Sequence, residues 1–116
     1  MPSFVKSKQA ALSTSSATAF YTTPATRVAT IRKAVVFNSD SSDRTIDIWI
    51  ANDGGAAANA NKLVTEVVAA GKSFFPNLPG KALPQGGKLY AAIDSGTSVT
   101  LDLSFSETTQ QEDAEV

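Results

Sequence analysis

The ten residues "RTIDIWIAND" (44–53) carry the pattern that decides the fold. Isoleucines alternate there with residues of other kinds, in the order Ile46, Asp47, Ile48, Trp49, Ile50 and Ala51. An alternation with a period of two is typical of a β-strand that buries one face. The stretch therefore predicts a strand whose isoleucines enter a core, while its other face presents a Trp and an Asp.

Similar segments recur along the chain and are separated by turn residues. The expected strands lie within 18–24, 27–38, 44–52, 63–69, 88–94 and 98–106. The Ser/Asp turn "SDSSD" (39–43) predicts a hairpin between the second and third of these. "AAANANK" (56–62) is too short for a stable helix and predicts a single turn or loop. This spacing predicts an all-β chain, an antiparallel β-sandwich or jelly-roll-like barrel with six to eight short strands.

The length of 116 residues fits a single β-sandwich domain over 1–116. We expect an N-terminal arm over about residues 1–15 and an acidic C-terminal tail over about 107–116. Lys6 and Lys8 lie in the arm, and the tail carries only acidic charges, at Glu107, Glu112, Asp113 and Glu115. The two ends are either solvated or meet neighbouring subunits through their opposite charges.

The composition excludes several classes of function. The chain has no Cys and no His, which rules out disulfides, thiolate metal sites and Ser-His or Cys-His nucleophile pairs. A net charge of −1 does not suit non-specific binding of nucleic acid. No apolar run approaches the roughly 20 residues of a membrane span, and residues 1–20 lack the apolar core of a secretory signal. We expect no cofactor, no metal, no small-molecule substrate and no catalytic residues.

Carboxylates offer the remaining route to catalysis. Asp47 and Asp102 each lie in the middle of an expected strand, opposite its aliphatic face. Two carboxylates about 5–10 Å apart could hydrolyse a glycoside, although outward acids on strands ordinarily keep sheets soluble. Asp40, Asp43 and Asp53 occupy turn-like segments that lack the ligand spacing of a calcium loop, so we interpret them as turn formers.

The aromatic residues are the candidates for an interface. Trp49 could pack in a core, contact another subunit, or act with Tyr90 or Tyr21 as a platform for a sugar. Phe74 and Phe75 are adjacent, so in an extended chain they point in opposite directions. One of them can enter the core, while the other needs a loop or a partner subunit to cover it.

The order of these features resembles a group of small virion proteins of tailed bacteriophages. The first half of the resemblance is "LSTSSATAFYTTPATRVATIRKAVVFNSDSSDRTIDIWIANDGG", with its Thr/Ser-rich lead, Tyr-Thr-x-Pro step and Ser/Asp turn. The second half is "VVAAGKSFFPNLPGKALPQGGKLYAAIDSGTSVTLDLSFSE", with its Ala-Ala-Gly turn, Pro/Gly loop and last two strands. The resemblance covers about residues 12–107 and departs from the family pattern at Thr26, where the family usually has Gly.

The resemblance implies a capsid cement or decoration protein that binds the outer surface of the head and stabilises it, as a homo-trimer in contact with the major capsid protein. Such a protein is made in the host cytoplasm and resides on the capsid surface of the virion. The alternatives are a neck, tail or fibre-attachment component and, outside virions, a carbohydrate-binding β-sandwich module. The candidate subunit or capsid interface residues are Trp49, Phe74, Phe75, Lys6, Lys8, Glu112, Asp113 and Glu115.

Overall fold

The structure of the chain is a computed structural model that describes residues 3–109. These residues form strands joined by loops, together with one short 3₁₀ turn at Asn59–Asn61, and contain no α-helix. The strands are β1 (Ser3–Ala11), β2 (Tyr21–Thr22), β3 (Arg27–Asn38), β4 (Arg44–Ala51), β5 (Lys62–Val68), β6 (Ser73–Phe74), β7 (Ala82–Leu83), β8 (Lys88–Ile93) and β9 (Val99–Thr109). No helix in this part of the chain is long and apolar enough to cross a membrane.

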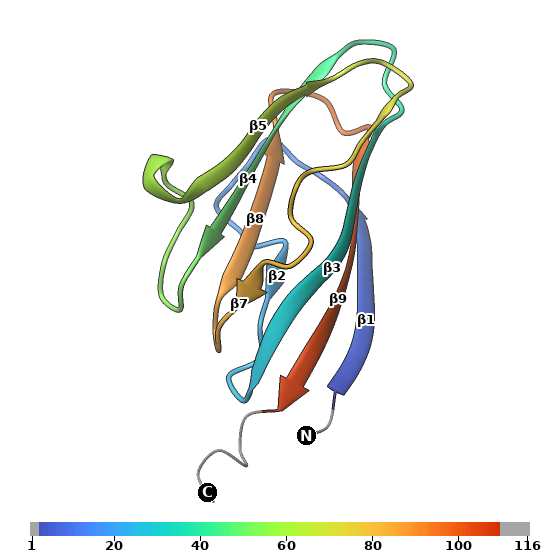
Figure 1. The fold of residues 1–116 in the computed structure, drawn as a ribbon. Helices are drawn as coiled ribbons and strands as arrows, with labels where there is room; N and C mark the ends of the chain where they lie inside the picture. Colours follow the sequence, from blue (N-terminus) through green and yellow to red (C-terminus); the bar gives the residue numbers. More distant parts are fainter. Residues whose placement is uncertain (1–2, 110–116) are drawn as a thin grey trace, which may run out of the picture.

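The strands form two antiparallel sheets that pack face to face (Figure 1). Sheet A has the order β1-β9-β3, and both β6 and β7 pair with the other side of β3. Sheet B has the order β2-β8-β4-β5. The prediction of an all-β antiparallel sandwich is therefore confirmed, and the strands beyond the expected set are β1 and the two-residue β6 and β7.

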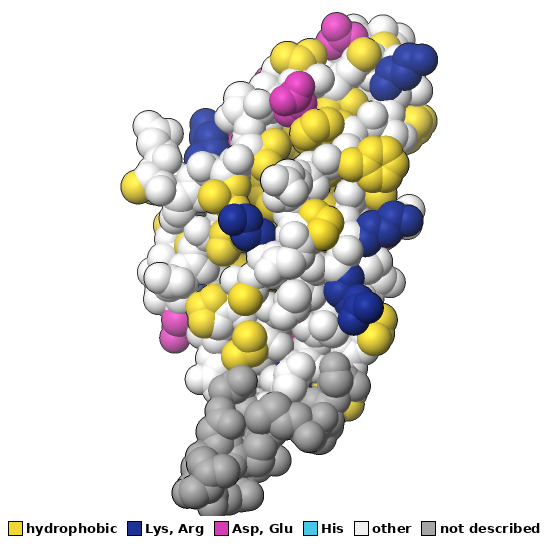
Figure 2. Space-filling model, in the orientation of Figure 1, with side chains coloured by type: hydrophobic (Ala, Val, Ile, Leu, Met, Phe, Trp, Pro, Cys, Tyr) yellow, Lys and Arg dark blue, Asp and Glu magenta, His cyan; other side chains and the backbone are white. Residues whose placement is uncertain are grey.

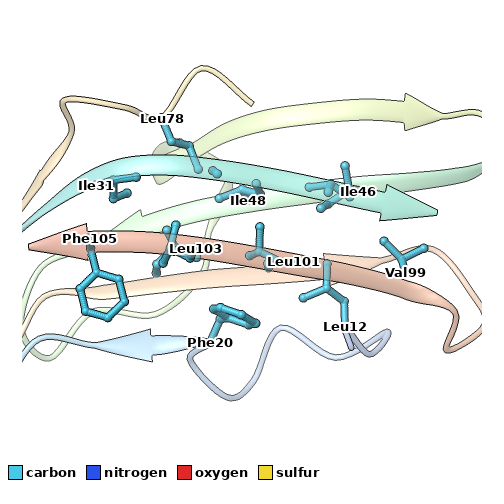
Figure 3. Close-up of a cluster of buried hydrophobic side chains, with 14 of the residues drawn as sticks. Leu12, Phe20, Ile31, Ile46, Ile48, Leu78, Val99, Leu101, Leu103 and Phe105 are labelled. Atoms are coloured by element: carbon cyan, nitrogen blue, oxygen red, sulfur yellow. The ribbon is translucent and has the colours of Figure 1, made fainter. Parts of the chain in front are cut away.

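The core lies between the two sheets, as the alternation of β4 and β9 predicts. Every second residue of β9 faces inward, and Leu101 and Leu103 are fully buried. They meet Ile46 and Ile48 of β4, which are also fully buried, in the cluster drawn in Figure 3. The free energy of this burial comes from removing aliphatic surface from water, at about 25 cal/mol per Å².

The predicted hairpin between residues 27–38 and 44–52 is wrong, because β3 and β4 belong to different sheets. After β3 the chain crosses to the other sheet, so that the apolar rows of the two strands face each other. The side-chain amide of Asn38, which is fully buried, holds this crossing by donating hydrogen bonds to the carbonyl oxygens of Ser42 and Val68, both at 2.9 Å. A Ser/Asp turn can join two strands of one sheet or two strands of different sheets, so the turn residues alone did not distinguish a hairpin from a crossing.

A β-bulge in β3 explains why its sequence is apolar on both faces. The register with β9 shifts between Ile31 and Lys33. Before the bulge the inward residues have odd numbers, ending with Ile31, whereas after it Ala34 and Val36 face inward. One inserted residue reverses the side-chain alternation. The core face of β3 is therefore lined by odd-numbered residues before the bulge and by even-numbered residues after it.

The expected arm and tail also need correction. Residues 3–11 form β1, which pairs with β9 along its whole length, so they are an edge strand of sheet A and not a free arm. Glu107 lies within β9 and is 1% exposed, so the described chain has no acidic tail before Thr109. Buried charges are costly unless they are paired, and Lys6 of β1 is one of the partners of Glu107. Residues 110–116 lie outside the described part.

The Pro/Gly-rich segment 75–87 closes one side of the sandwich. Leu78 and Leu83 from this segment are fully buried in the core. The backbone holds the loop against the bulge of β3, since Gly80 N–H donates to Ile31 O at 2.8 Å and Ile31 N–H donates to Lys81 O at 2.9 Å. Gly80 has a φ of 91°, a conformation that a residue with a side chain rarely adopts.

Truncating the core should destabilise the fold strongly. Leu103→Ala removes a fully buried side chain and should lower the free energy of unfolding by about 2–5 kcal/mol. Phe75→Ala, at a position that is 65% exposed, is the control and should change it by less than about 1 kcal/mol. Urea unfolding followed by the fluorescence of Trp49, the only Trp, measures both values. Equal unfolding midpoints for the two variants would contradict the packing described.

Candidate functional site

A buried carboxylate ties the two sheets together near the end of β9. Glu107 accepts a hydrogen bond from Arg27 of β3 at 2.7 Å and pairs with Lys6 of β1 at 3.1 Å. The hydroxyl of Tyr21, in β2 of the opposite sheet, donates to its other oxygen. Four strands therefore meet at one side chain, which we call the Glu107 cluster, with Glu107, Lys6, Tyr21 and Arg27 as its members.

The electrostatics of the cluster favour an ionised Glu107 and a neutral Tyr21. Burial by itself would raise the pKa of Glu107, but the hydrogen bonds from Tyr21, Arg27 and Lys6 outweigh it and hold that pKa below its ordinary value. Burial, then the hydrogen bond to Glu107 and its negative charge, raises the pKa of Tyr21. Both carboxylate oxygens are engaged by donors, so the geometry suits a structural tie and leaves no lone general base.

Aromatic side chains pack against two members of the Glu107 cluster. The ring of Tyr21 packs on Phe105, with ring centroids 4.2 Å apart. The guanidinium of Arg27 lies 4.2 Å from the centroid of Phe4, a cation–π contact. The hydroxyl of Thr23 is buried nearby and has no hydrogen-bond partner among the described residues.

Trp49 lies on the outer face of sheet B, where its own chain covers it. It forms a small second cluster with Ala51, Tyr90 and Ala92, and Ala57 packs against this cluster from the loop after β4. The hydroxyl of Tyr90 donates to Gly55 O in the same loop at 3.0 Å. The loop after β4 thus folds back over the face of β4 opposite the isoleucines. A contact between Trp49 and another subunit stays a prediction.

The sugar platform that was one alternative for Trp49, Tyr90 and Tyr21 has no exposed ring face in this fold. Trp49 is 8% exposed and Tyr90 is 5% exposed, so neither presents a ring face to a ligand. The ammonium of Lys62 lies 5.5 Å from the centroid of the Trp49 ring. Tyr21 is engaged in the Glu107 cluster. The alternation of β4 identified the face but not the loop that returns to cover it.

Asp47 and Asp102 do not form a catalytic pair. Asp47 lies on the outer face of sheet B, beside Lys62 at 3.8 Å and Thr65, whose hydroxyl donates to it at 2.7 Å. Asp102 lies on the outer face of sheet A. Because packed sheets are about 10 Å apart, carboxylates on their two outer faces lie beyond the reach needed for glycoside hydrolysis.

The turn aspartates act as the sequence predicts, by bonding nearby donors. Asp40 accepts from Arg44 at 3.0 Å, a bond that lowers the pKa of Asp40. Asp43 accepts from the backbone of Ala70 at 3.0 Å. Within residues 3–109, no group of three or more acidic side chains gathers in a geometry that could hold a metal ion.

The two adjacent phenylalanines point in opposite directions, as expected. Phe74 is half-buried and packs against the core, whereas Phe75 is 65% exposed. The register of β3 with β6 places Phe37, which is 42% exposed, opposite Ser73, and extending it by one residue sets Phe75 opposite Val35. Phe37, Phe75 and the half-buried Val35 form an exposed apolar group at one end of the outer face of sheet A, which we call the sheet A patch. The exposure of Phe37 could not be predicted from the sequence, because the bulge reverses the alternation of β3.

Basic residues lie near this patch, on the strand and loops at the same side of sheet A. They are Arg32, Lys33, Lys72 and Lys81. Figure 2 shows Lys and Arg side chains along the border of the molecule occupied by sheet A, next to exposed hydrophobic groups. Several acidic residues instead lie on or beside sheet B, among them Asp47, Asp53 and Glu66. The two sides of the described sandwich therefore differ in charge.

The structure shows intrachain contacts for two of the charged interface candidates, and an interface role for them stays a prediction. Lys6 is engaged by Glu107, and Lys8 donates to the carbonyl oxygen of Phe20 at 2.6 Å while lying 5.0 Å from the centroid of its ring. Glu112, Asp113 and Glu115 lie outside the described residues, so their role stays a prediction. Glu107 itself was missed as part of the fold, although it continues the inward row of odd residues from Val99.

The described residues form shallow hollows on the surface, of which two are the best defined. One, of about 230 Å³, lies between β1 and the loop that follows it, beside Lys8 and Phe20. The other, of about 460 Å³, lies between Thr23, Asp53 and Lys88. Both mix polar and apolar groups without the largely apolar lining that is typical of a small-molecule site.

No family model matches the chain, and no curated protein matches it. Among solved structures it is similar to a chain in the structure of infectious bursal disease virus Gx strain, with a TM-score of 0.31 and 9% sequence identity. The similarity covers 94% of this chain and 37% of that chain. A likeness at this TM-score carries no argument about the fold or the function.

The Glu107 cluster should make the fold acid-sensitive. Because the pKa of Glu107 in the folded state lies below its ordinary value of 4.5, its stabilisation is present above pH 4.5 and is lost as the pH falls through the folded-state pKa. Glu107→Gln should lower the free energy of unfolding at pH 7 by about 2 kcal/mol and flatten its dependence on pH below 4.5. Urea unfolding from pH 7 to pH 3 measures both effects, with Asp102→Asn as the matched surface control. An unchanged acid slope in Glu107→Gln would refute this account of the cluster.

Proposed function

We propose that this chain is a structural virion protein of a tailed bacteriophage, which binds the outer surface of the capsid as a cement or decoration protein. Its partner would be the major capsid protein, and its location the virion surface. The family resemblance over residues 12–107 supports this proposal. Several described carboxylates, among them Asp40, Asp43 and Glu107, serve turns, ion pairs or the core, which suits a binding role better than a catalytic one.

The observation that carries the proposal is the sheet A patch. Most aromatic side chains of the described chain are used internally, by the core, the Glu107 cluster or the Trp49 cluster. Phe37 and Phe75 are exceptions, and the extended register of β3 with β6 sets them diagonally across the two strands on the outer face of sheet A. Large aromatic anchors grouped on a surface are the residues that dominate the affinity of protein interfaces.

The basic residues near the patch define the chemistry of the surface it would meet. Lys33 pairs in register with Ser104 on the outer face of sheet A, and Lys72 precedes the strand that carries Phe74. A partner with a hydrophobic pocket and acidic groups around it would complement both the aromatic anchors and these charges. Charges at the rim of such an interface act mainly on the association rate and on specificity.

Cross-linking explains how a small module could stabilise a shell. Each trimer would contact several capsid subunits, so that individually weak contacts sum by avidity. Opposite charge on the two sides of the sandwich suits head-to-tail packing of copies, which closes into a ring when the rotation allows it. A neck, tail or fibre-attachment position would use the same kind of surface and differs in the number of copies per virion.

Removing the aromatic anchors should abolish tight binding to capsids. The double variant Phe37→Ser with Phe75→Ser should weaken binding to capsids lacking this protein by about tenfold or more, because hot-spot aromatics typically contribute at least 1–2 kcal/mol. Val5→Ser, at a 75% exposed position near the other end of sheet A, is the matched control and should bind normally. Co-sedimentation over a concentration series measures both, and equal binding of the two variants would overturn the assignment of this patch.

The acidic residues beyond Thr109 provide a second test of docking. Deleting residues 110–116 removes Glu112, Asp113 and Glu115 while leaving β9 and the Glu107 cluster in place. If these charges meet basic groups on the shell, the deletion should weaken binding more at low salt than above about 0.5 M salt, where screening is strong. Undiminished binding at low salt would mean that these acids do not take part.

A further inference from the structure

Strand β5 forms an open edge of sheet B. It pairs with β4 on one side, and no other strand of the described chain pairs with its other side. It stands at the border of the sandwich opposite β1 and β9 in Figure 1. Leu63, Thr65, Glu66 and Val67 are all exposed along it. An edge strand with free N–H and C=O groups is a template for pairing with another strand.

The long edge strand of the other sheet carries two inward charges, whereas β5 carries one. In β1 the side chains of Lys6 and Lys8 turn toward the interior side, where they contact Glu107 and the carbonyl of Phe20. Inward charges of this kind are a common device against edge-to-edge pairing. Beyond its first residue, β5 has no Pro and one charged side chain, Glu66, which its pairing with Ile46 sets on the inner face. The bulge of β5 lies near its start, between Lys62 and Val64.

The backbone of β4 fixes which of its residues bond β5. Asp94 N–H donates to Thr45 O at 3.1 Å, so the carbonyl of Thr45 points toward β8. Backbone groups alternate in direction along a strand. The N–H and C=O groups of Ile46 and Ile48 therefore point the other way, toward β5.

The same alternation sets the free edge of β5. Glu66 and Val64 lie opposite those two isoleucines and use their backbone groups to bond β4. Thr65 and Val67 consequently direct their N–H and C=O groups away from sheet B, at the open edge. Two hydrogen-bonding positions are thus available to an incoming strand.

The sequence of β5 is self-complementary about this edge. Thr65 is the central residue of the seven in Lys62–Val68. In an antiparallel pair related by a two-fold axis at Thr65, Leu63 of one copy faces Val67 of the other, and these side chains are 46% and 58% exposed in the single chain. Glu66 then faces Val64 of the second copy, whereas a two-fold axis one residue further along would set two Glu66 carboxylates opposite each other.

We propose that β5 binds β5 of a second copy of this chain as an antiparallel pair centred on Thr65, which joins the two sheets B into one continuous sheet. The contact does not depend on the proposed capsid role, and it leaves the sheet A patch free. Because one strand pair buries little surface, the contact is weak between isolated chains and gains from the high local concentration of copies on a particle.

A single introduced cysteine tests the register, since the chain has none of its own. Across a hydrogen-bonded antiparallel pair the two Cα atoms lie about 5.5 Å apart, within the range of a disulfide. Thr65→Cys should therefore form a disulfide-linked dimer under mild oxidation at high protein concentration. In Val67→Cys, the matched control, the two cysteines are offset by four residues, about 13 Å along the strands, and should cross-link about tenfold more slowly. Equal rates, or no dimer from Thr65→Cys, would overturn the proposal.

Charge pairs at the flanking positions separate this register from a non-specific contact. In the Thr65→Cys background, Leu63→Lys with Val67→Lys sets like charges opposite each other at both flanks and should lower the cross-linking rate about tenfold. Leu63→Lys with Val67→Glu sets opposite charges across the same positions and should restore it. Thermal unfolding of each variant verifies the fold, and an identical loss in both variants would contradict the antiparallel pairing.

Discussion

The ionised carboxylate of Glu107 is the constraint on which the closed end of the sandwich depends. A buried charge without partners would cost several kcal/mol, so β9 can keep Glu107 on its inward face only if donors from other strands reach it. Arg27, Lys6 and Tyr21 supply these donors from three different strands. The same contacts fix β1 at the edge of sheet A and hold β2 of sheet B against the end of the core. A side chain that looks like the first acid of a tail is therefore what joins the two sheets there.

That tie also decides which surfaces are left for partners. Its Lys6 and, two residues on, Lys8 face the inner side of β1, at the edge of sheet A. At the far side of the sandwich no described strand pairs with the outer edge of β5. The loop after β4 covers Trp49 and Tyr90 on the outer face of sheet B. The outer face of sheet A has no covering segment of this kind in residues 3–109, and it exposes Phe37 and Phe75. The patch and the edge are thus separate surfaces, one suited to a different protein and the other to a second copy.

The sequence predicted what depends on neighbouring residues and missed what depends on distant ones. Alternation in β4 and β9 identified both strands and their buried faces, because side-chain direction is a local property. β3 pairs with β9 instead of β4 because the chain crosses between the sheets after β3. A Ser/Asp turn in the sequence does not indicate such a crossing. Of the candidate interface residues, Phe75 is exposed as the alternation of adjacent residues allows. The exposure of Phe37 could not be predicted because the bulge reverses the alternation of β3. The burial of Glu107 was missed because the acidic residues that follow it made it look like part of a tail.

The central claim is that this sandwich covers a phage head as a structural component. The most direct test is its copy number in purified virions, measured by quantitative mass spectrometry relative to the major capsid protein. A shell-binding cement protein requires a ratio near one copy per capsid subunit, or another large fraction of the capsid count. A handful of copies per virion would assign the chain to the neck, tail or fibre base, and its absence from virions would contradict the claim altogether.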